Sequence, residues 1–204
     1  PIPEVTDLRY ALEFESMLGK GLISIILLDR PSMDPPNGLV ELGIPFTVAI
    51  DEQAADARAK MLVYRTAGLE IFTRMHLPET LTAVNVALIT DAAVQAVPMA
   101  TGFWPSDHDR SARSSAQLRL LQDYLAKENL GFLPNFDVLI SDEIRRASDV
   151  LDALDFAAER SAQTGQAVVA LYPTAEIWDV LRFWLQHSNH RGSVIAPLSA
   201  VLSR

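Results

Sequence analysis

Short continuous runs of apolar residues alternate along this chain with longer amphipathic stretches. The clearest run is LISIILL at residues 22–28, which ends in the polar pair Asp29-Arg30. A run without a polar face is typical of a strand that is covered on both sides in a parallel sheet. In parallel α/β folds the functional groups lie at the carboxyl ends of the strands, which is where Asp29 and Arg30 stand.

Helical periodicity fills the stretches between the apolar runs. Apolar residues recur at three- and four-residue spacing within residues 54–64, 118–125, 151–158 and 177–184. Ser114 or Ser115 is a candidate N-cap for the second of these helices, and Thr174 for the last. A further helix is predicted over residues 81–97, ending before Pro98.

Four glycines separate helix-like stretches from the apolar runs that follow them, namely Gly68, Gly131, Gly165 and Gly192. Glycine adopts the left-handed conformation at the end of a helix without steric cost, and the chain then turns into a strand. The repeated transition indicates successive βα units.

The pattern therefore predicts an α/β fold, a distorted (β/α) barrel of about seven strands. Strands are expected at residues 22–28, 46–50, 69–73, 98–103, 131–133, 138–140, 167–171 and 194–197. The runs at 131–133 and 138–140 are too close for a parallel crossover, which needs about a dozen residues. Either one βα unit is shortened or one of these two strands does not form. We expect residues 1–20 to be an N-terminal extension and residues 21–204 to form a single domain.

Composition limits the partners of the chain. The net charge of −9 disfavours nucleic acid and anionic membrane surfaces. The absence of cysteine excludes disulfides and thiolate metal sites. No apolar run approaches the roughly 20 residues that a transmembrane helix needs, so no transmembrane segment is expected in this chain. The sequence also lacks a glycine-rich phosphate loop, a nucleophile elbow and a dinucleotide-binding motif.

Several short motifs together resemble the divergent polysaccharide deacetylase family. They are the strand end LLD at residues 27–29, GIPFTVAID at 43–51, YRTAGLE at 64–70 and GSVIAPLSAVL at 192–202. The resemblance implies a distorted (β/α) barrel, a periplasmic or secreted protein of the cell envelope, and metal-dependent removal of N- or O-acetyl groups from glycans. It also leads us to expect a signal or anchor segment upstream of Pro1.

The resemblance further implies a divalent metal held by one aspartate and two histidines, with a second aspartate as base. Such a metal polarises the acetyl carbonyl and lowers the pKa of its water, while the base takes the proton. In this chain Asp29 matches the base, but Arg30 stands at the aspartate ligand position and cannot ligate. The first histidine position falls on Arg74 without a gap, and on His76 after a shift of two residues.

The remaining histidine positions also depart from the family pattern. His108 comes several residues late after the fourth strand, and Tyr172 stands where a histidine follows the penultimate strand. We therefore expect no metal cofactor and a catalytically inactive domain that acts as a binding or scaffolding module. The alternative is a metal-dependent carbohydrate deacetylase, in which Asp29, His76 and His108 hold zinc or another divalent ion in a rearranged site.

Aromatic residues follow two of the predicted strands. Phe103-Trp104 stands after one strand and Tyr172 after another, so these rings are expected at the same barrel mouth. They could stack on sugar rings, fill the mouth or form a docking surface. The expected partner is accordingly a glycan, a peptidoglycan fragment or an envelope protein.

These predictions can be combined into one geometric expectation. Asp29, Arg74, Trp104 and Tyr172 should gather at one barrel mouth, because each lies at the carboxyl end of a strand. Arg74 or Arg30 should lie within ion-pair reach of Asp29, where a guanidinium would replace the charge of the metal.

Overall fold

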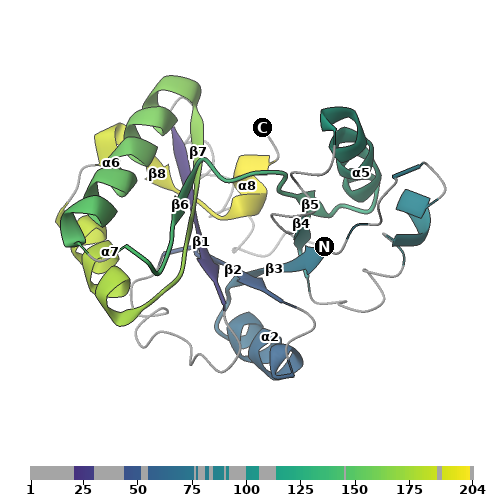
Figure 1. Ribbon diagram of the computed structural model, residues 1–204, viewed down its shortest axis with the longest axis horizontal. Coiled ribbons are helices and arrows are strands. Elements are labelled where there is room, and N and C mark those ends of the chain that lie inside the picture. The colour runs from purple at the N-terminus through teal and green to yellow at the C-terminus, as the bar shows by residue number, and fades with distance from the viewer. Residues whose placement is uncertain are drawn as a thin grey trace, which may run out of the picture.

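The computed structural model describes residues 21–29, 44–51, 55–75, 77, 81–82, 85–89, 91, 100–105, 114–144, 146–187 and 190–202. Within these residues eight parallel strands form one curled sheet, with helices packed around it (Figure 1). This architecture confirms the predicted α/β class and the distorted (β/α) barrel. The predicted extension over residues 1–20 lies outside the described residues.

The strands are β1 (Leu22–Leu28), β2 (Thr47–Ile50), β3 (Glu70–Met75), β4 (Gly102–Pro105), β5 (Gly131–Phe132), β6 (Val138–Ile140), β7 (Gln166–Leu171) and β8 (Val194–Ile195). Seven of them follow the order β5-β4-β3-β2-β1-β7-β6, and β8 pairs with the start of β1. All eight predicted strands are present. The fourth begins at Gly102 rather than near residue 98, and residues 98 and 99 lie outside the described part.

The helices are α2 (Ala57–Thr66), α5 (Ser115–Lys127), α6 (Ala147–Thr164), α7 (Ala175–His187) and the short α8 (Leu198–Leu202). Ser114 caps α5 through a reciprocal pair of hydrogen bonds with Gln117, and the Thr174 hydroxyl accepts from the backbone of α7. The helix predicted over residues 81–97 is described at 81–82, 85–89 and 91; residues 85–89 and 91 are helical, and residues 81–82 are not. In the described part of the chain, no helix is both long and apolar enough to cross a bilayer.

Alternation along the strands divides the core into an outer and an inner layer. The side chains of Ile23, Ile25 and Leu27 in β1 belong to the outer layer, with residues of α2, α6 and α7. Those of Leu22, Ile26 and Leu28 belong to the inner layer, with residues of α8. Because the strand is buried on both sides, it needs the continuous apolar run seen in the sequence.

Strands β5 and β6 are both real, although only residues 133–137 separate them. They lie at opposite edges of the sheet, so this link crosses the open side of the barrel without an intervening helix. Asp137 secures the link, because its carboxylate accepts from the backbone N–H of Val168 at 2.7 Å and from Arg160 at 2.6 Å. The shortened βα unit is therefore the correct alternative.

Three of the four predicted helix-ending glycines have the left-handed conformation. The φ angles are 78° at Gly68, 89° at Gly165 and 80° at Gly192. The prediction is wrong at Gly131, because Asn129 takes this conformation after α5, with φ 57°. Gly131 is needed for space instead, since a Cβ atom there would lie 2.7 Å from the buried ring of Phe72.

Polar contacts close the end of the barrel at which β2 and β3 begin, opposite the carboxyl ends of the strands. The Thr47 hydroxyl donates to Glu70 at 2.6 Å and accepts from the backbone N–H of Leu198 at 3.1 Å. The Glu70 carboxylate also accepts from the N–H of Ser199 at 3.2 Å. This carboxylate at the start of α8 explains why the segment after β8 folds back beneath the sheet.

Replacing Gly131 with alanine should destabilise the fold by about 1–3 kcal/mol, because the added methyl group overpacks against Phe72. The cost should fall in a Phe72→Leu background, which removes the ring atoms in question. Gly102→Ala is the matched control, since its methyl group would also meet the backbone carbonyl of Gly131 at 2.6 Å. Urea unfolding of the single and double variants measures how far Phe72→Leu reduces the destabilisation caused by each alanine. An equal reduction for Gly131→Ala and Gly102→Ala would contradict this packing.

Candidate functional site

The carboxyl ends of the parallel strands meet at one edge of the sheet. Asp29 follows β1, Asp51 follows β2, Arg74 and Trp104 lie near the ends of β3 and β4, and Tyr172 follows β7. The strand assignment behind the predicted mouth is therefore confirmed. The prediction that the Asp29 side chain gathers with those of Arg74, Trp104 and Tyr172 is wrong, because Asp29 stands on the outer face of the sheet and the others on the inner face.

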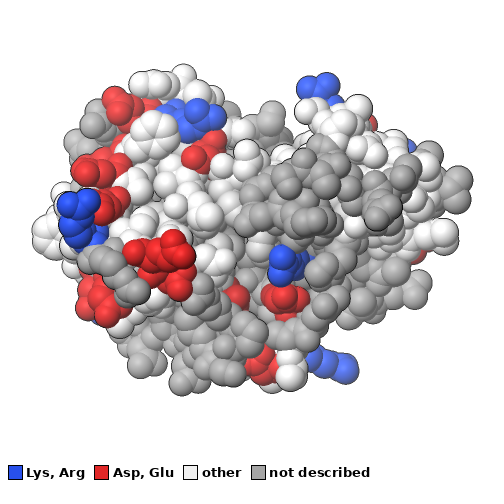
Figure 2. All heavy atoms as spheres, in the orientation of Figure 1, with Lys and Arg blue, Asp and Glu red and all other residues white. Residues whose placement is uncertain are grey.

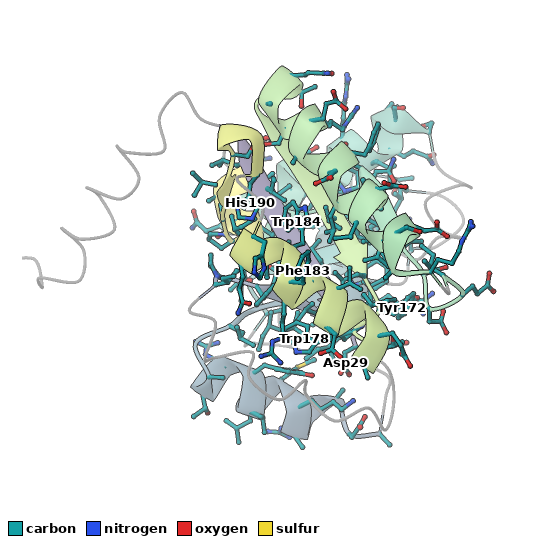
Figure 3. All side chains as sticks on the ribbon, turned by 90° about the vertical axis from the view of Figure 1, so that its left-hand side faces the viewer. Asp29, Tyr172, Trp178, Phe183, Trp184 and His190 are labelled. Atoms are coloured by element: carbon teal, nitrogen blue, oxygen red, sulfur yellow. The ribbon has the colours of Figure 1, made fainter. Side chains whose placement is uncertain are left out.

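Asp29 is enclosed between β1 and α2 rather than open to the barrel interior (Figure 3). Its carboxylate accepts a hydrogen bond from Lys60 Nζ at 2.9 Å and another from the Tyr64 hydroxyl at 3.1 Å. The Asp29 side chain is 2% exposed and that of Lys60 is 10% exposed. Lys60 also pairs with Asp56, at 3.3 Å. The cation on Asp29 is thus a lysine of α2.

Burial dominates the titration of this cluster. It raises the pKa of the Asp29 carboxyl above its usual range, while the hydrogen bonds from Lys60 and Tyr64 offset part of the rise. Burial and the neighbouring Asp29 charge also raise the pKa of the Tyr64 hydroxyl. Tyr64 therefore keeps its proton and serves as a permanent donor to Asp29.

Arg74 and Asp51 form the charged part of the inner face. Arg74 Nη1 lies 3.4 Å from the Asp51 carboxylate, and about a third of each side chain is exposed. The prediction that Arg74 pairs with Asp29 is wrong, because the alternation along β3 directs Arg74 inward while Asp29 faces outward. Arg30, the other predicted partner of Asp29, lies outside the described residues.

Aromatic rings adjoin this ion pair. The guanidinium carbon of Arg74 lies 5.8 Å from the centre of the Trp104 ring, and the two residues are register partners on β3 and β4. Phe136, from the link across the open side, packs against Trp104 with ring centres 5.8 Å apart. Tyr172 packs against the same inner core layer. Asp51, Arg74, Trp104, Phe136 and Tyr172 are called the inner mouth below.

An apolar floor lies beneath the inner mouth and leaves no room for a water molecule. It consists of the side chains of Ile26, Ala49, Phe72, Trp104, Leu133 and Phe136. Two donor atoms of the inner mouth, Arg74 Nε and Trp104 Nε1, are buried without a hydrogen-bond partner. The inner mouth therefore combines an apolar floor, an ion pair and two unmet donors, and these donors can contact a ligand that accepts hydrogen bonds.

The remaining predicted residues are distributed as follows. Phe103 does not reach the inner mouth, because its side chain is fully buried in the outer layer beneath α5. His76 and His108 of the alternative metal set lie outside the described residues. Among the residues that are described, no group of three His, Cys, Asp or Glu side chains is arranged to hold a metal ion.

Sequence reasoning missed four residues of these clusters. Asp51 follows a strand just as Asp29 does, so the same rule could have found it. Lys60 and Tyr64 are four residues apart on α2 and share one face, which was a signal for a joint partner. Phe136 had no local signal, because its position depends on how the link crosses the open side.

Lys60→Met should destabilise the protein by about 3 kcal/mol at neutral pH, because it leaves the Asp29 carboxylate buried without its cation. Removing Lys60 should raise the pKa of the Asp29 carboxyl further, because the hydrogen bond and the charge of Lys60 lower it in the unaltered chain. Above the raised pKa the folded state must bury an ionised carboxylate without its cation, so the loss of stability is largest at neutral pH. The deficit relative to the unaltered chain should therefore shrink as the pH falls toward the ordinary carboxyl value of 3.8.

Urea unfolding between pH 7 and pH 4 measures this trend. Adding Asp29→Asn to Lys60→Met should recover most of the loss at pH 7, because the buried charge is then gone. Lys127→Met removes a lysine from α5 as a control. A Lys60→Met deficit that stays constant with pH would contradict the role given to this pair.

Acidic side chains gather over α6 and α7 on the face shown in Figure 2.

Against known proteins, the sequence matches no family profile and no curated protein. Solved structures do match the fold. A family 4 carbohydrate esterase from Streptomyces lividans, in complex with acetate, is 16% identical over 89% of this chain and 94% of its own, with a TM-score of 0.59.

Two further structures match over most of their length. An uncharacterized protein from Agrobacterium tumefaciens is 16% identical over 89% of each chain, with a TM-score of 0.56. The catalytic domain of a peptidoglycan N-acetylglucosamine deacetylase from Eubacterium rectale is 11% identical over 88% of this chain and 89% of its own, with a TM-score of 0.53. This chain therefore has the fold of the polysaccharide deacetylases.

Proposed function

We propose that this domain binds a glycan at the inner mouth and does not hydrolyse it. The observation that carries the proposal is the guanidinium of Arg74, which stands among the inward-facing side chains at the strand ends and contacts both Asp51 and Trp104. A fixed cation at this place opposes the binding of a second positive ion. The domain would then keep the deacetylase fold as a recognition module.

The surroundings of Asp29 support the absence of hydrolysis. A general base must reach the proton that it abstracts, directly or through one water molecule. Both oxygens of Asp29 are instead engaged by Lys60 and Tyr64 beneath α2. For Asp29 to serve as a base, it would have to leave both partners and turn to the opposite face of the sheet.

The chemistry of the inner mouth supports a sugar ligand. Sugar rings present an apolar C–H face together with polar groups at their edges, and aromatic rings beside hydrogen-bond donors complement both. Trp104 and Phe136 supply the rings, and Arg74 supplies the donors. A peptidoglycan fragment is the leading candidate, with an envelope protein as the other partner to test.

We also place the domain outside the cytoplasm, in the periplasm or among secreted proteins. The similarity of its fold to a peptidoglycan deacetylase domain supports this location. A glycan-binding module of the cell envelope needs access to the wall polymer, and the proposed ligand class is consistent with that.

The competing function is metal-dependent deacetylation by Asp29, His76 and His108 with zinc or another divalent ion. The fold shared with a family 4 carbohydrate esterase favours it. Under this alternative, a metal would supply the activated water and polarise the acetyl carbonyl. The two functions differ in whether acetate is released.

Acetylated chito-oligosaccharides and peptidoglycan fragments should therefore release no acetate above background, with or without added zinc, cobalt or manganese. Peptidoglycan fragments should still bind, and Trp104→Ala should weaken binding about tenfold through loss of ring contact. Calorimetric titration gives the affinities, and circular dichroism checks the fold. Phe183→Ala removes a half-exposed ring of α7 as the control.

Metal-dependent acetate release that is lost in Asp29→Asn would establish the competing function instead. If Trp104→Ala destabilises the fold while peptidoglycan fragments and envelope proteins fail to bind the unaltered chain, the ring is core packing. The binding function would then be refuted.

A further inference from the structure

We propose that the inner mouth selects carboxylate-bearing sugars, with Arg74 Nε–H and Trp104 Nε1–H as the two donors to the carboxylate. This inference rests on the proposed glycan-binding function and adds the chemical class of the ligand. It depends on the two donors and their surroundings, not on the similarity to known proteins.

The two donors are buried and have no acceptor among the described residues. Unmet buried donors are uncommon in folded proteins, because each costs the desolvation of a polar group without return. Here two of them belong to register partners on adjacent strands, Arg74 of β3 and Trp104 of β4. Their coincidence at a strand-end mouth points to an acceptor from outside the described residues, which we assign to the ligand.

The type of acceptor follows from the donors. The indole N–H and the guanidinium can only donate, so the ligand group must accept, and the arginine favours an acceptor that carries negative charge. A carboxylate matches the planar guanidinium better than a neutral oxygen does. A sugar ring that bears the carboxylate would lie across Trp104 and Phe136, above the apolar floor.

Asp51 is the internal competitor for this ligand. Its 3.4 Å contact with Arg74 is longer than the roughly 2.7–2.9 Å of a strong charge-assisted hydrogen bond. Both side chains are about one-third exposed, so part of the guanidinium faces solvent, while its Nε is buried. A ligand carboxylate must therefore displace Asp51 and enter the mouth to reach Nε. Asp51 thus holds Arg74 in place loosely and can be displaced.

Trp178 provides a useful contrast. Its Nε1 is also buried without a partner, but it belongs to the outer layer and its ring packs against Phe46. The remaining tryptophan, Trp184, donates to Asp155 at 2.8 Å. Each of the three tryptophans of this chain therefore has a different indole environment, and only that of Trp104 adjoins the inner mouth.

The test is a titration followed through the three indole N–H signals in nitrogen–proton correlation NMR. Trigalacturonate is the probe, and its fully methyl-esterified form is the matched neutral control. Trp104→Phe, which keeps an aromatic ring, assigns the signal of Trp104 by its loss. The free acid should shift this signal as a hydrogen bond forms, while the ester should not and the signals of Trp178 and Trp184 should stay in place.

Variants extend the test to affinity. Arg74→Gln should weaken trigalacturonate binding at least tenfold, and Trp104→Phe about fivefold, through loss of a single donor. Asp51→Asn should strengthen it severalfold, because the competing carboxylate is gone. A gain of affinity cannot arise from misfolding. Arg146→Gln, which removes an exposed arginine paired with Asp149 on α6, should leave binding unchanged.

Two results would overturn the inference. Equal shifts with the free acid and the ester would show that the charge is not recognised, while glycan binding itself would stand. Absence of any Trp104 shift with the acid would refute the carboxylate site, and the titration with peptidoglycan fragments would still decide the proposed function separately.

Discussion

The alternation of side chains along the parallel strands is the constraint on which the rest of this structure depends. It divides the core into two layers and decides which residue at a strand end can meet a ligand. Asp29 follows Leu28 on β1 and so turns outward to α2, where Lys60 and Tyr64 hold it. Arg74 follows Phe72 by two positions on β3 and so turns inward to the mouth.

One consequence is that charge at the strand ends is used for two different purposes. The buried pair of Asp29 and Lys60 joins the end of β1 to α2. Such a pair adds little net stability, but removing one partner is strongly destabilising, because the other charge is left buried alone. The exposed pair of Asp51 and Arg74 contributes little to stability, because water screens it. A loose pair beside aromatic rings is better suited to exchange with a ligand than to support the fold.

Much of the fold was predictable because its elements are local. The β1 run and the glycines at residues 68, 165 and 192 carry their structure in their own sequence. Gly131 was misread because its constraint is the Phe72 ring, which is distant in sequence. The site was less predictable for the same reason: the partner of Asp29 comes from a helix, and Phe136 reaches Trp104 only because residues 133–137 cross the open side.

The central claim is that the strand ends of this deacetylase fold form a recognition site rather than a metal centre. Elemental analysis of the protein, purified at neutral pH and equilibrated with zinc before exhaustive dialysis, tests it most directly. We expect zinc far below one ion per chain, in the unaltered protein and in His76→Ala alike. One zinc ion per chain, lost in His76→Ala, would contradict it.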